Sequence, residues 1–325
     1  MNEGIAHCRQ EGVMYFGVPS GSLLDHTVKL LIAAGLLKEN PGRKYEVESE
    51  LDGVTFRILD RIDIGRLIVM GVVDAGIAPK DYLHETAVND QVEPIADFVY
   101  SKQTRQPSRL VVASKPRLIT SIDDCRGAVI ASELPNLTKA MLMQKFGFSA
   151  EETRNVFQSH GKTEGLVQFG VSKAFTDITE TGKTLRENDL VELATLFESN
   201  PQLVANRDAT ENPAFVARID QLATCFNAAL LREVIPTTML TMNVPRARLD
   251  EVLKLLPPTP DIIPTVDNQV VALTSQVPQQ CVQTLMYQLL QCGADKIFDH
   301  VSQLTLSQDM RISCITTRHE DCDPA

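Results

Sequence analysis

Paired cysteines, long apolar runs and an excess of basic residues are all missing from this 325-residue chain. Its seven cysteines include no CxxC pair, and an odd, scattered set favours reduced thiols in a cytoplasm over a disulfide framework. No apolar run reaches the ~18 residues that a membrane helix needs, because Asp74 interrupts the most apolar stretch, residues 67–78. The polar N-terminus, MNEGIAHCRQ, has no signal-peptide core. We therefore expect a soluble, cytoplasmic protein with no membrane partner.

The chain is acidic, with a formal net charge of −11 and a sequence pI near 5.1. This balance argues against a nucleic-acid partner, because a general nucleic-acid surface needs a clear basic excess. It leaves room for a local basic pocket that binds a phosphorylated small molecule. The length exceeds that of one ordinary core, so two or three domains are expected.

Alternating strand and helix patterns predict an α/β fold with mostly parallel strands. Residues 13–18 predict a buried strand, followed by a PSGS turn and a helix over 23–34, and residues 72–77 predict another strand. A second unit begins near Arg109. Its strands are expected at 110–114, 128–132 and 174–178, with a helix over 136–146. Strands at 190–197 and 202–205 are expected to return the chain to the first unit.

The C-terminal third predicts a separate small domain. Strands at 238–244, 262–266, 270–275 and 296–301 alternate with helices at 246–256 and 281–292. The order βαββαβ is typical of the ferredoxin-like split motif. Residues after about 309 are polar and predict a loose tail.

The most informative segment is residues 164–185, EGLVQFGVSKAFTDITETGKTL. Its strand runs into a polar turn made of Thr179, Glu180, Thr181, Gly182, Lys183 and Thr184. Threonine hydroxyls and successive backbone N–H groups at such a turn form an anion-binding concavity, and a glycine lets the backbone approach a phosphate closely. An ordinary strand-to-helix turn with an N-cap is the alternative. A Walker A loop is excluded, because Asp177 stands where that loop needs its first glycine.

The same segment resembles a known enzyme family. Its signature is filled by Glu164, Gly170, Asp177, Thr181, Gly182, Thr184 and Leu185. The chain resembles the long form of ATP phosphoribosyltransferase, the enzyme that opens histidine biosynthesis. Other matching stretches are PSGSLLDHT, GVVDAGIAPKDYLHE, RLVVAS, AVIASELPNLTKAM and NVPRARLDEVLKLLP, which extend the resemblance from about Tyr15 to Ser307.

The resemblance implies a three-part architecture. We expect two periplasmic-binding-protein-like α/β domains around a cleft and a C-terminal ferredoxin-like βαββαβ regulatory domain. The expected boundaries are 1–107 with 191–233 for the first domain, 108–190 for the second, 234–310 for the regulatory domain and 311–325 for a tail.

The resemblance also implies a reaction. ATP and phosphoribosyl pyrophosphate would condense at the purine N1, with Mg²⁺ bridging the leaving pyrophosphate, and no protein nucleophile is required. Histidine would be the inhibitor, and the chain would form homo-oligomers, with a hexamer in equilibrium with dimers.

Candidate site residues fall in two groups. The turn 179–184 would hold the ribose 5-phosphate, while Glu164 and Asp177 would meet ribose hydroxyls or solvated Mg²⁺. A strand-end cap is the alternative role for Asp177, and close packing is the alternative for Gly76. The facing domain would be lined by Ser20, Gly21, Ser22, Asp74 and Gly76.

Several departures from the family pattern remove positive charge. Ser20 and Ser22 replace a lysine and an arginine, and Asp60 stands where an arginine is expected, with Arg61 adjacent. Basic side chains supply charge-assisted contacts to phosphate, so their loss should weaken substrate binding. A non-catalytic or substrate-shifted relative that binds a nucleotide or phosphosugar is therefore an alternative. Further departures are Glu133 and Leu134 in place of a basic–aromatic pair, Lys173 for an aspartate and Phe175 for Ile or Val.

The C-terminal residues Cys314, His319 and Cys322 lie close together in the sequence. Without CxxC spacing they do not make a convincing zinc site. We therefore assign no residue as a metal ligand.

Overall fold

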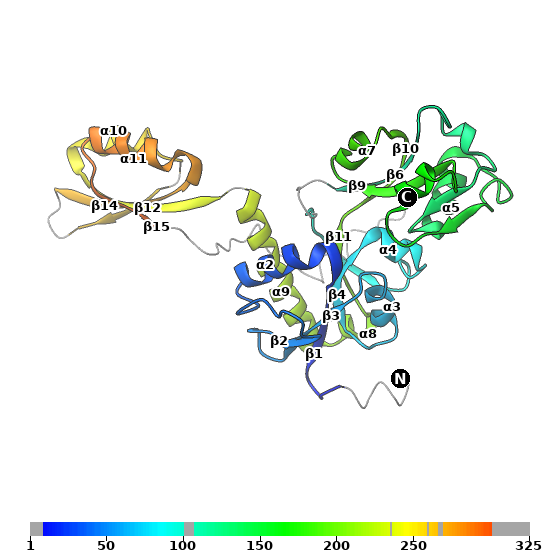
Figure 1. The fold of residues 1–325 in the computed structure, drawn as a ribbon. Helices are drawn as coiled ribbons and strands as arrows, with labels where there is room; N and C mark the ends of the chain where they lie inside the picture. Colours follow the sequence, from blue (N-terminus) through cyan, green and yellow to red (C-terminus); the bar gives the residue numbers. More distant parts are fainter. Residues whose placement is uncertain (1–8, 101–106, 235, 259, 266–268, 301–325) are drawn as a thin grey trace, which may run out of the picture. The chain divides into compact units, whose positions relative to one another are not determined.

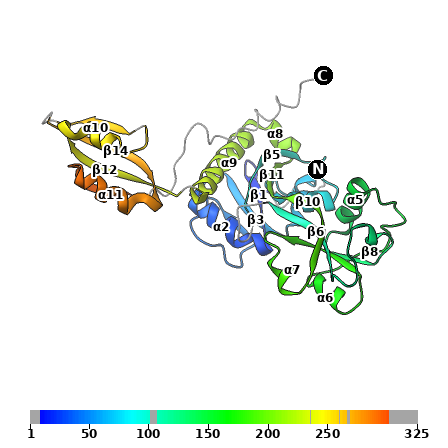
Figure 2. The ribbon, with the colours of Figure 1, turned by 90° about the horizontal axis from the view of Figure 1, so that it is seen from above.

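The computed structural model describes residues 9–100, 107–234, 236–258, 260–265 and 269–300, and it divides into two compact units. The first unit extends to Thr224 and the second begins at Cys225. Both units are drawn in Figures 1 and 2. The first unit contains two sheets. Each sheet, together with the helices that pack on it, forms one lobe, and we call these lobe one and lobe two.

Lobe one is built on a six-stranded sheet in the order β2-β3-β1-β4-β11-β5. β1 runs parallel to β3 and β4, so their carboxyl ends lie at the same edge, whereas β11 is antiparallel to β4 and β5. The strands are β1 Met14–Pro19, β2 Glu46–Glu48, β3 Val54–Leu59, β4 Ala75–Pro79, β5 Glu93–Asp97 and β11 Pro201–Ala205. The helices are η1 Gly21–Leu23, α2 Leu24–Ala33, α3 Ile64–Val69, α4 Lys80–Glu85, α8 Arg207–Glu211 and α9 Pro213–Val234.

The core of lobe one follows from its apolar strands. Every residue of β1 and β4 is buried, as expected for parallel strands covered on both faces. Phe16 and Phe56 meet edge to face with ring centroids 5.7 Å apart. Arg218 of α9 donates a hydrogen bond of 2.7 Å to the Gly12 carbonyl, so the first half of this helix lies against the start of β1.

Lobe two is built on a five-stranded sheet in the order β10-β6-β9-β7-β8. The strands are β6 Ser108–Ser114, β7 Ile130–Ser132, β8 Val156–Gln158, β9 Ala174–Thr179 and β10 Val191–Ser199. The helices are η2 Asp123–Cys125, α5 Pro135–Phe146, α6 Thr163–Gln168 and α7 Lys183–Glu187. One face is covered by α5, through buried residues that include Leu134, Leu137 and Leu142.

The chain returns from lobe two to lobe one at Asn200. β10 pairs along its length with β6 of lobe two, whereas the next strand, β11, pairs with β4 and β5 of lobe one. We expected the return at residue 191, which is one strand too early. The strand expected at 190–197 is present, but its pairing with β6, Ser108–Ser114, could not be read from the sequence.

The second unit has the expected split βαβ topology. Its strands β12 Thr237–Pro245, β13 Asp261–Pro264, β14 Val270–Pro278 and β15 Asp295–His300 form a sheet in the order β13-β14-β12-β15 with antiparallel neighbours. Alternate residues of β12, including Leu240, Met242 and Val244, are buried on one face. Figure 1 shows α10 and α11 on a common side of this sheet. The helical segments are η3 Arg246–Arg248, α10 Leu249–Leu253, η4 Gln279–Cys281 and α11 Val282–Gln291.

Candidate functional site

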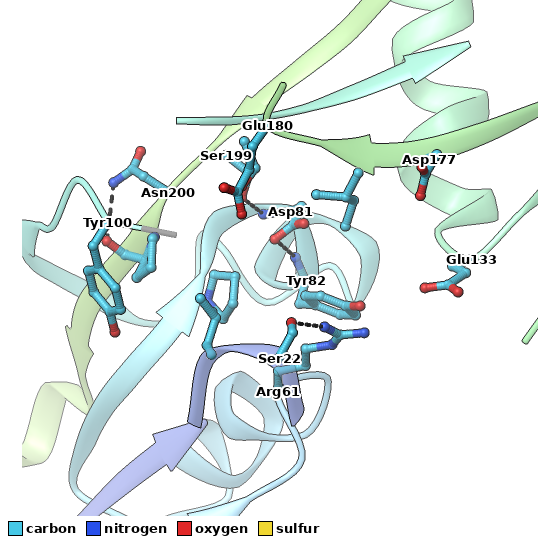
Figure 3. A pocket seen from close by; sticks show the side chains of 15 residues that line it. Ser22, Arg61, Asp81, Tyr82, Tyr100, Glu133, Asp177, Glu180, Ser199 and Asn200 are labelled. Carbon is cyan, nitrogen blue, oxygen red and sulfur yellow. Dashed lines mark hydrogen bonds between the residues drawn. The ribbon is translucent and has the colours of Figure 1, made fainter. Parts of the chain in front are cut away.

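A cleft of about 330 Å³ lies between lobe one and lobe two (Figure 3). Lobe one contributes side chains that follow the carboxyl ends of β1, β3 and β4, namely Ser22, Arg61 and Tyr82. Lobe two contributes Glu133 after β7, together with Asp177 on β9 and Glu180 after it. Ligands of open α/β sheets bind at the carboxyl ends of the strands, which is where this cleft lies.

Arg61 is the only cationic side chain among the described residues that line this cleft. Its Nη1 donates a hydrogen bond of 3.0 Å to Ser22 Oγ, and its guanidinium carbon lies 5.0 Å from the centre of the Tyr82 ring. Figure 3 shows the guanidinium beneath this ring. The hydroxyl and the aromatic ring hold the arginine in place, so it can present positive charge to a bound anion.

Carboxylates outnumber this cation. Burial, together with the smaller effects of the Glu164 and Glu133 charges, raises the pKa of Asp177 to about 6. The two sequence-predicted acids are therefore electrostatic neighbours, although Glu164 lies on α6 and Asp177 on β9. The cleft itself is lined by the carboxylates of Asp81, Glu133, Asp177 and Glu180.

The predicted phosphate turn is a tight strand-to-helix connection. Buried Thr179 accepts a hydrogen bond of 2.9 Å from the Gly182 backbone N–H through its hydroxyl. Gly182 has φ +67°, a conformation that glycine adopts without strain. The Arg186 guanidinium braces the turn through a 2.8 Å bond to the Thr181 carbonyl. Thr179 is therefore internal to the turn, whereas Thr181, Lys183 and Thr184 are exposed at its surface.

Asp74 and Gly76 do not line the cleft, contrary to our expectation. Asp74 precedes β4 at the opposite edge of the sheet, where it binds the Arg9 guanidinium at 2.5 and 2.6 Å and accepts a 2.8 Å bond from the Tyr15 N–H. A Cβ on Gly76 would lie 2.9 Å from the Gly17 carbonyl, so this glycine permits β1 and β4 to approach. The sequence placed the strand end at residue 77, whereas β4 continues to Pro79.

The residues of the turn that follows β1 have different roles. Ser22 lines the cleft, whereas Ser20 occupies the N-cap position of η1 without a side-chain hydrogen bond to it, and its N–H donates a 2.8 Å bond to the Leu59 carbonyl at the end of β3. Gly21 has φ +77°, which explains the glycine at this turn. Neither Ser20 nor Gly21 is among the residues that line the cleft.

Asp81 is the main site residue that the sequence did not single out. Its backbone N–H donates a bond of 3.1 Å to Ser199 Oγ, and its carboxylate accepts a 3.0 Å bond from the Tyr82 N–H. The side chain is 2% exposed, and this burial raises its pKa. The signal was present in the matching stretch GIAPKDYLHE, but which of its residues reach the cleft depends on where the strand ends.

Direct metal ligation is limited in this site. Across the residues that the structure describes, no group of three or more His, Cys, Asp or Glu is placed to hold a metal ion. The C-terminal Cys314, His319 and Cys322, like the expected tail 311–325, lie outside the described residues. No helix in the described part of the chain is long and apolar enough to span a membrane.

Two α/β lobes enclose a polar cleft, with an anchored arginine on one wall and the carboxylates of Glu133, Asp177 and Glu180 on the other, and they define a two-domain α/β protein with a cleft between its lobes. The family profile described as "ATP phosphoribosyltransferase" matches residues 61–228, and that of "HisG, C-terminal domain" matches 236–300. The chain belongs to the ATP phosphoribosyltransferase family in its long form.

Curated relatives match nearly the whole chain. An ATP phosphoribosyltransferase from Desulfosudis oleivorans is 33% identical over 291 residues, which are 89% of this chain and 97% of the relative. One from Chlorobaculum parvum is 34% identical over 293 residues, covering 89% and 96%. A solved structure of an ATP phosphoribosyl transferase (HisG:HisZ) complex from Thermotoga maritima shares the fold, with a TM-score of 0.53, 23% identity, and coverage of 66% of this chain and 98% of that one.

Proposed function

We propose that the protein condenses ATP with phosphoribosyl pyrophosphate to give N1-phosphoribosyl-ATP and pyrophosphate. The observation that supports this most directly is the cleft, which Arg61 of lobe one lines together with Asp177 and Glu180, at the point where β9 of lobe two leads into its turn. Family membership supplies the reaction, and the two walls supply a place for each substrate.

The roles of the residues follow from their chemistry. The surface groups of the turn, Thr181, Lys183 and Thr184, would bind the ribose 5-phosphate through hydroxyl, ammonium and backbone N–H groups. Arg61 and Ser22 would bind phosphates of ATP. The purine N1 is itself the nucleophile, so the protein contributes by aligning it with the ribose carbon and by stabilising the leaving pyrophosphate.

Mg²⁺ is the metal that this donor set fits. Hard carboxylate oxygens suit Mg²⁺, which is commonly held by one or two carboxylates together with substrate phosphates and water. Asp177 and Glu133 would hold the ion, since both line the cleft. When bound, the ion neutralises charge on the leaving pyrophosphate.

A second candidate is a substrate-shifted relative that binds a nucleotide or phosphosugar. The charge of the cleft favours it, because four carboxylates accompany one arginine where the family substrates are polyanions. One measurement distinguishes the two candidates. Pyrophosphate release from phosphoribosyl pyrophosphate is assayed in the presence of Mg²⁺, with ATP as the acceptor. Release that depends on ATP supports the transferase. Release with another acceptor alone supports the shifted relative, and tight ligand binding without release supports a non-catalytic one.

We also propose that the βαββαβ unit is a regulatory domain that binds histidine, and that the chain assembles through dimers into a hexamer. The support is the match of residues 236–300 to the C-terminal domain of the family. Truncation after Glu233 should leave substrate binding intact and abolish the response to histidine. Histidine binding to the truncated chain, measured by calorimetry, would contradict this assignment, and light scattering of the full chain tests the hexamer.

A further inference from the structure

Helix α4 of lobe one ends in a carboxylate that enters lobe two. The Glu85 side chain accepts two backbone hydrogen bonds from the first turn of α5, from the Asn136 N–H at 3.2 Å and the Leu137 N–H at 2.8 Å. The Asn136 side-chain amide returns a 3.3 Å bond to the Glu85 carbonyl. Glu85 is only 6% exposed and its bond to the Leu137 N–H is buried, whereas Asn136 lies at the surface of this junction between the lobes.

Helix α5 depends on this carboxylate because its own sequence supplies no cap. Its N-cap position is occupied by Leu134, which has no side-chain hydrogen bond to the helix, and Pro135 follows. The first amides of a helix need acceptors, and a negative charge at this end is favourable. Burial raises the pKa of Glu85, while these two amides, Arg66 and Lys139 act to lower it.

Hydrogen bonds connect the first turn of α5 to β7 and β9, the two strands of lobe two that lead to Glu133 and carry Asp177. Thr138, in the first turn of α5, lies 3.0 Å from the Ser132 hydroxyl, which accepts a 2.7 Å bond from the Thr176 hydroxyl. All three are buried. Ser132 directly precedes Glu133, and Thr176 directly precedes Asp177, so the first turn of α5 is bonded next to two of the four cleft carboxylates.

The opposite end of α4 is attached to lobe two at a different place. There the Asp81 N–H bonds Ser199 Oγ at 3.1 Å, and the Lys80 N–H bonds the Asn200 carbonyl at 3.2 Å, where the chain crosses between the lobes. A crossing strand can act as a hinge. The Glu85 junction lies at the other end of the helix, away from this crossing, and therefore resists rotation about it.

We infer that Glu85 is a positioning residue that fixes lobe two against lobe one, so that the phosphate turn and Arg61 hold their substrates at the reacting distance. Alignment of two substrates contributes only when both are bound. Loss of Glu85 should therefore lower kcat while the affinity of lobe two for its own substrate is kept. The kinetic part of this inference rests on the proposed function.

The test compares Glu85→Gln with Glu152→Gln in the full chain. Glu152 is a matched control, because it also accepts a backbone N–H, from Ser149 at 2.7 Å, but within lobe two. Glu85→Gln is expected to lower kcat roughly tenfold, the effect of one charge-assisted bond, with the Kd for phosphoribosyl pyrophosphate within about twofold of wild type. Hydrogen exchange should rise in α5, in α4 and at Ser199–Asn200. Glu152→Gln should leave kcat, this Kd and the exchange of α4 and Ser199–Asn200 unchanged, although its partner Arg126 also bonds the last carbonyl of α5.

An unchanged kcat with faster exchange in α5 alone would overturn the inference, because Glu85 would then be only a helix cap. If Glu85→Gln fails to fold, Asn136→Ala removes only the side-chain amide bond and should shift kcat and exchange in the same direction by a smaller factor. No shift in Asn136→Ala would then count against the inference. If the wild type does not use ATP, the proposed function fails, and exchange at α4 and Ser199–Asn200 still decides whether Glu85 joins the lobes.

Discussion

The Arg61 guanidinium binds the Ser22 hydroxyl at 3.0 Å, although the two residues are 39 positions apart in the chain. Ser22 occupies a turn that carries basic residues in the sequences that this chain resembles. The structure shows that an arginine from the neighbouring strand end reaches the same turn. Arg61 therefore supplies positive charge beside Ser22 at this wall of the cleft, with the serine as its anchor.

Arg61→Ala should weaken ATP binding about tenfold or more, because a hydrogen bond to a charged group contributes about 1.5–3 kcal/mol. Calorimetric titration with ATP and Mg²⁺ measures this. Arg154→Ala is the control, since Arg154 is exposed and pairs with Glu151 on the surface of lobe two. Equal ATP affinity in Arg61→Ala and wild type would place the nucleotide elsewhere.

Introducing Ser20→Lys and Ser22→Arg together tests whether the native serines limit activity. Ser20 is outside the cleft lining, and an arginine at 22 would meet Arg61, so only part of the added charge is useful. We expect low wild-type activity with ATP and a rise in kcat/KM in the double variant. Steady-state kinetics of the double and both single variants would show it. A high wild-type rate that falls on substitution would indicate that the serines are adapted to their substrate.

Thr181→Ala and Thr184→Val should each weaken phosphoribosyl pyrophosphate binding about tenfold without unfolding the protein, for the same energetic reason. Both side chains are exposed on the turn, so neither change opens a cavity. Thr179→Val is the informative contrast, because it removes the internal bond to Gly182 and should also lower thermal stability. Unchanged affinity in both surface variants would remove the turn from the site.

Asp177→Asn should stabilise the fold while it impairs catalysis. The pKa of Asp177 is raised to about 6, so the folded protein holds this proton more tightly than the unfolded chain. The free energy of unfolding contributed by this group therefore falls as the pH rises from about 4 to about 6, by about 2–3 kcal/mol. Asparagine carries no charge and avoids this loss.

Urea unfolding of Asp177→Asn and wild type at pH 4 and pH 7.5 measures the difference. The variant should be more stable at pH 7.5, and the gain should shrink at pH 4. Glu151→Gln, with a carboxylate that is 73% exposed in the same lobe, is the control and should change stability by less than about 0.5 kcal/mol. A gain that is equal at both pH values would not come from this titration.

The elements themselves were largely predictable because their signals are local. The strand expected at 174–178 is β9, Ala174–Thr179, and the helix expected at 136–146 is α5, Pro135–Phe146. The split βαβ order of the last unit was also correct, since each strand and helix carries its own apolar period.

The site was less predictable because it depends on strand ends and on long-range partners. A two-residue error at the end of β4 put Asp74 in the cleft and left Asp81 out of it. Glu85 has the sequence of an ordinary helix-terminal glutamate, and its partners in α5 are 51 and 52 residues away. Contacts of this kind have no periodicity that a single sequence could reveal.

The place of β11 between β4 and β5 has a consequence for synthesis on the ribosome. β4 and β5 are made first, but β11, which pairs with both of them, is made only after all of lobe two. A nascent chain that ends at Ser199 therefore has every strand of lobe two and still lacks the strand that joins β5 to the other four strands of the lobe-one sheet. The inserted lobe can fold during translation, whereas β5 can join the sheet of lobe one only after residues 201–205 have emerged.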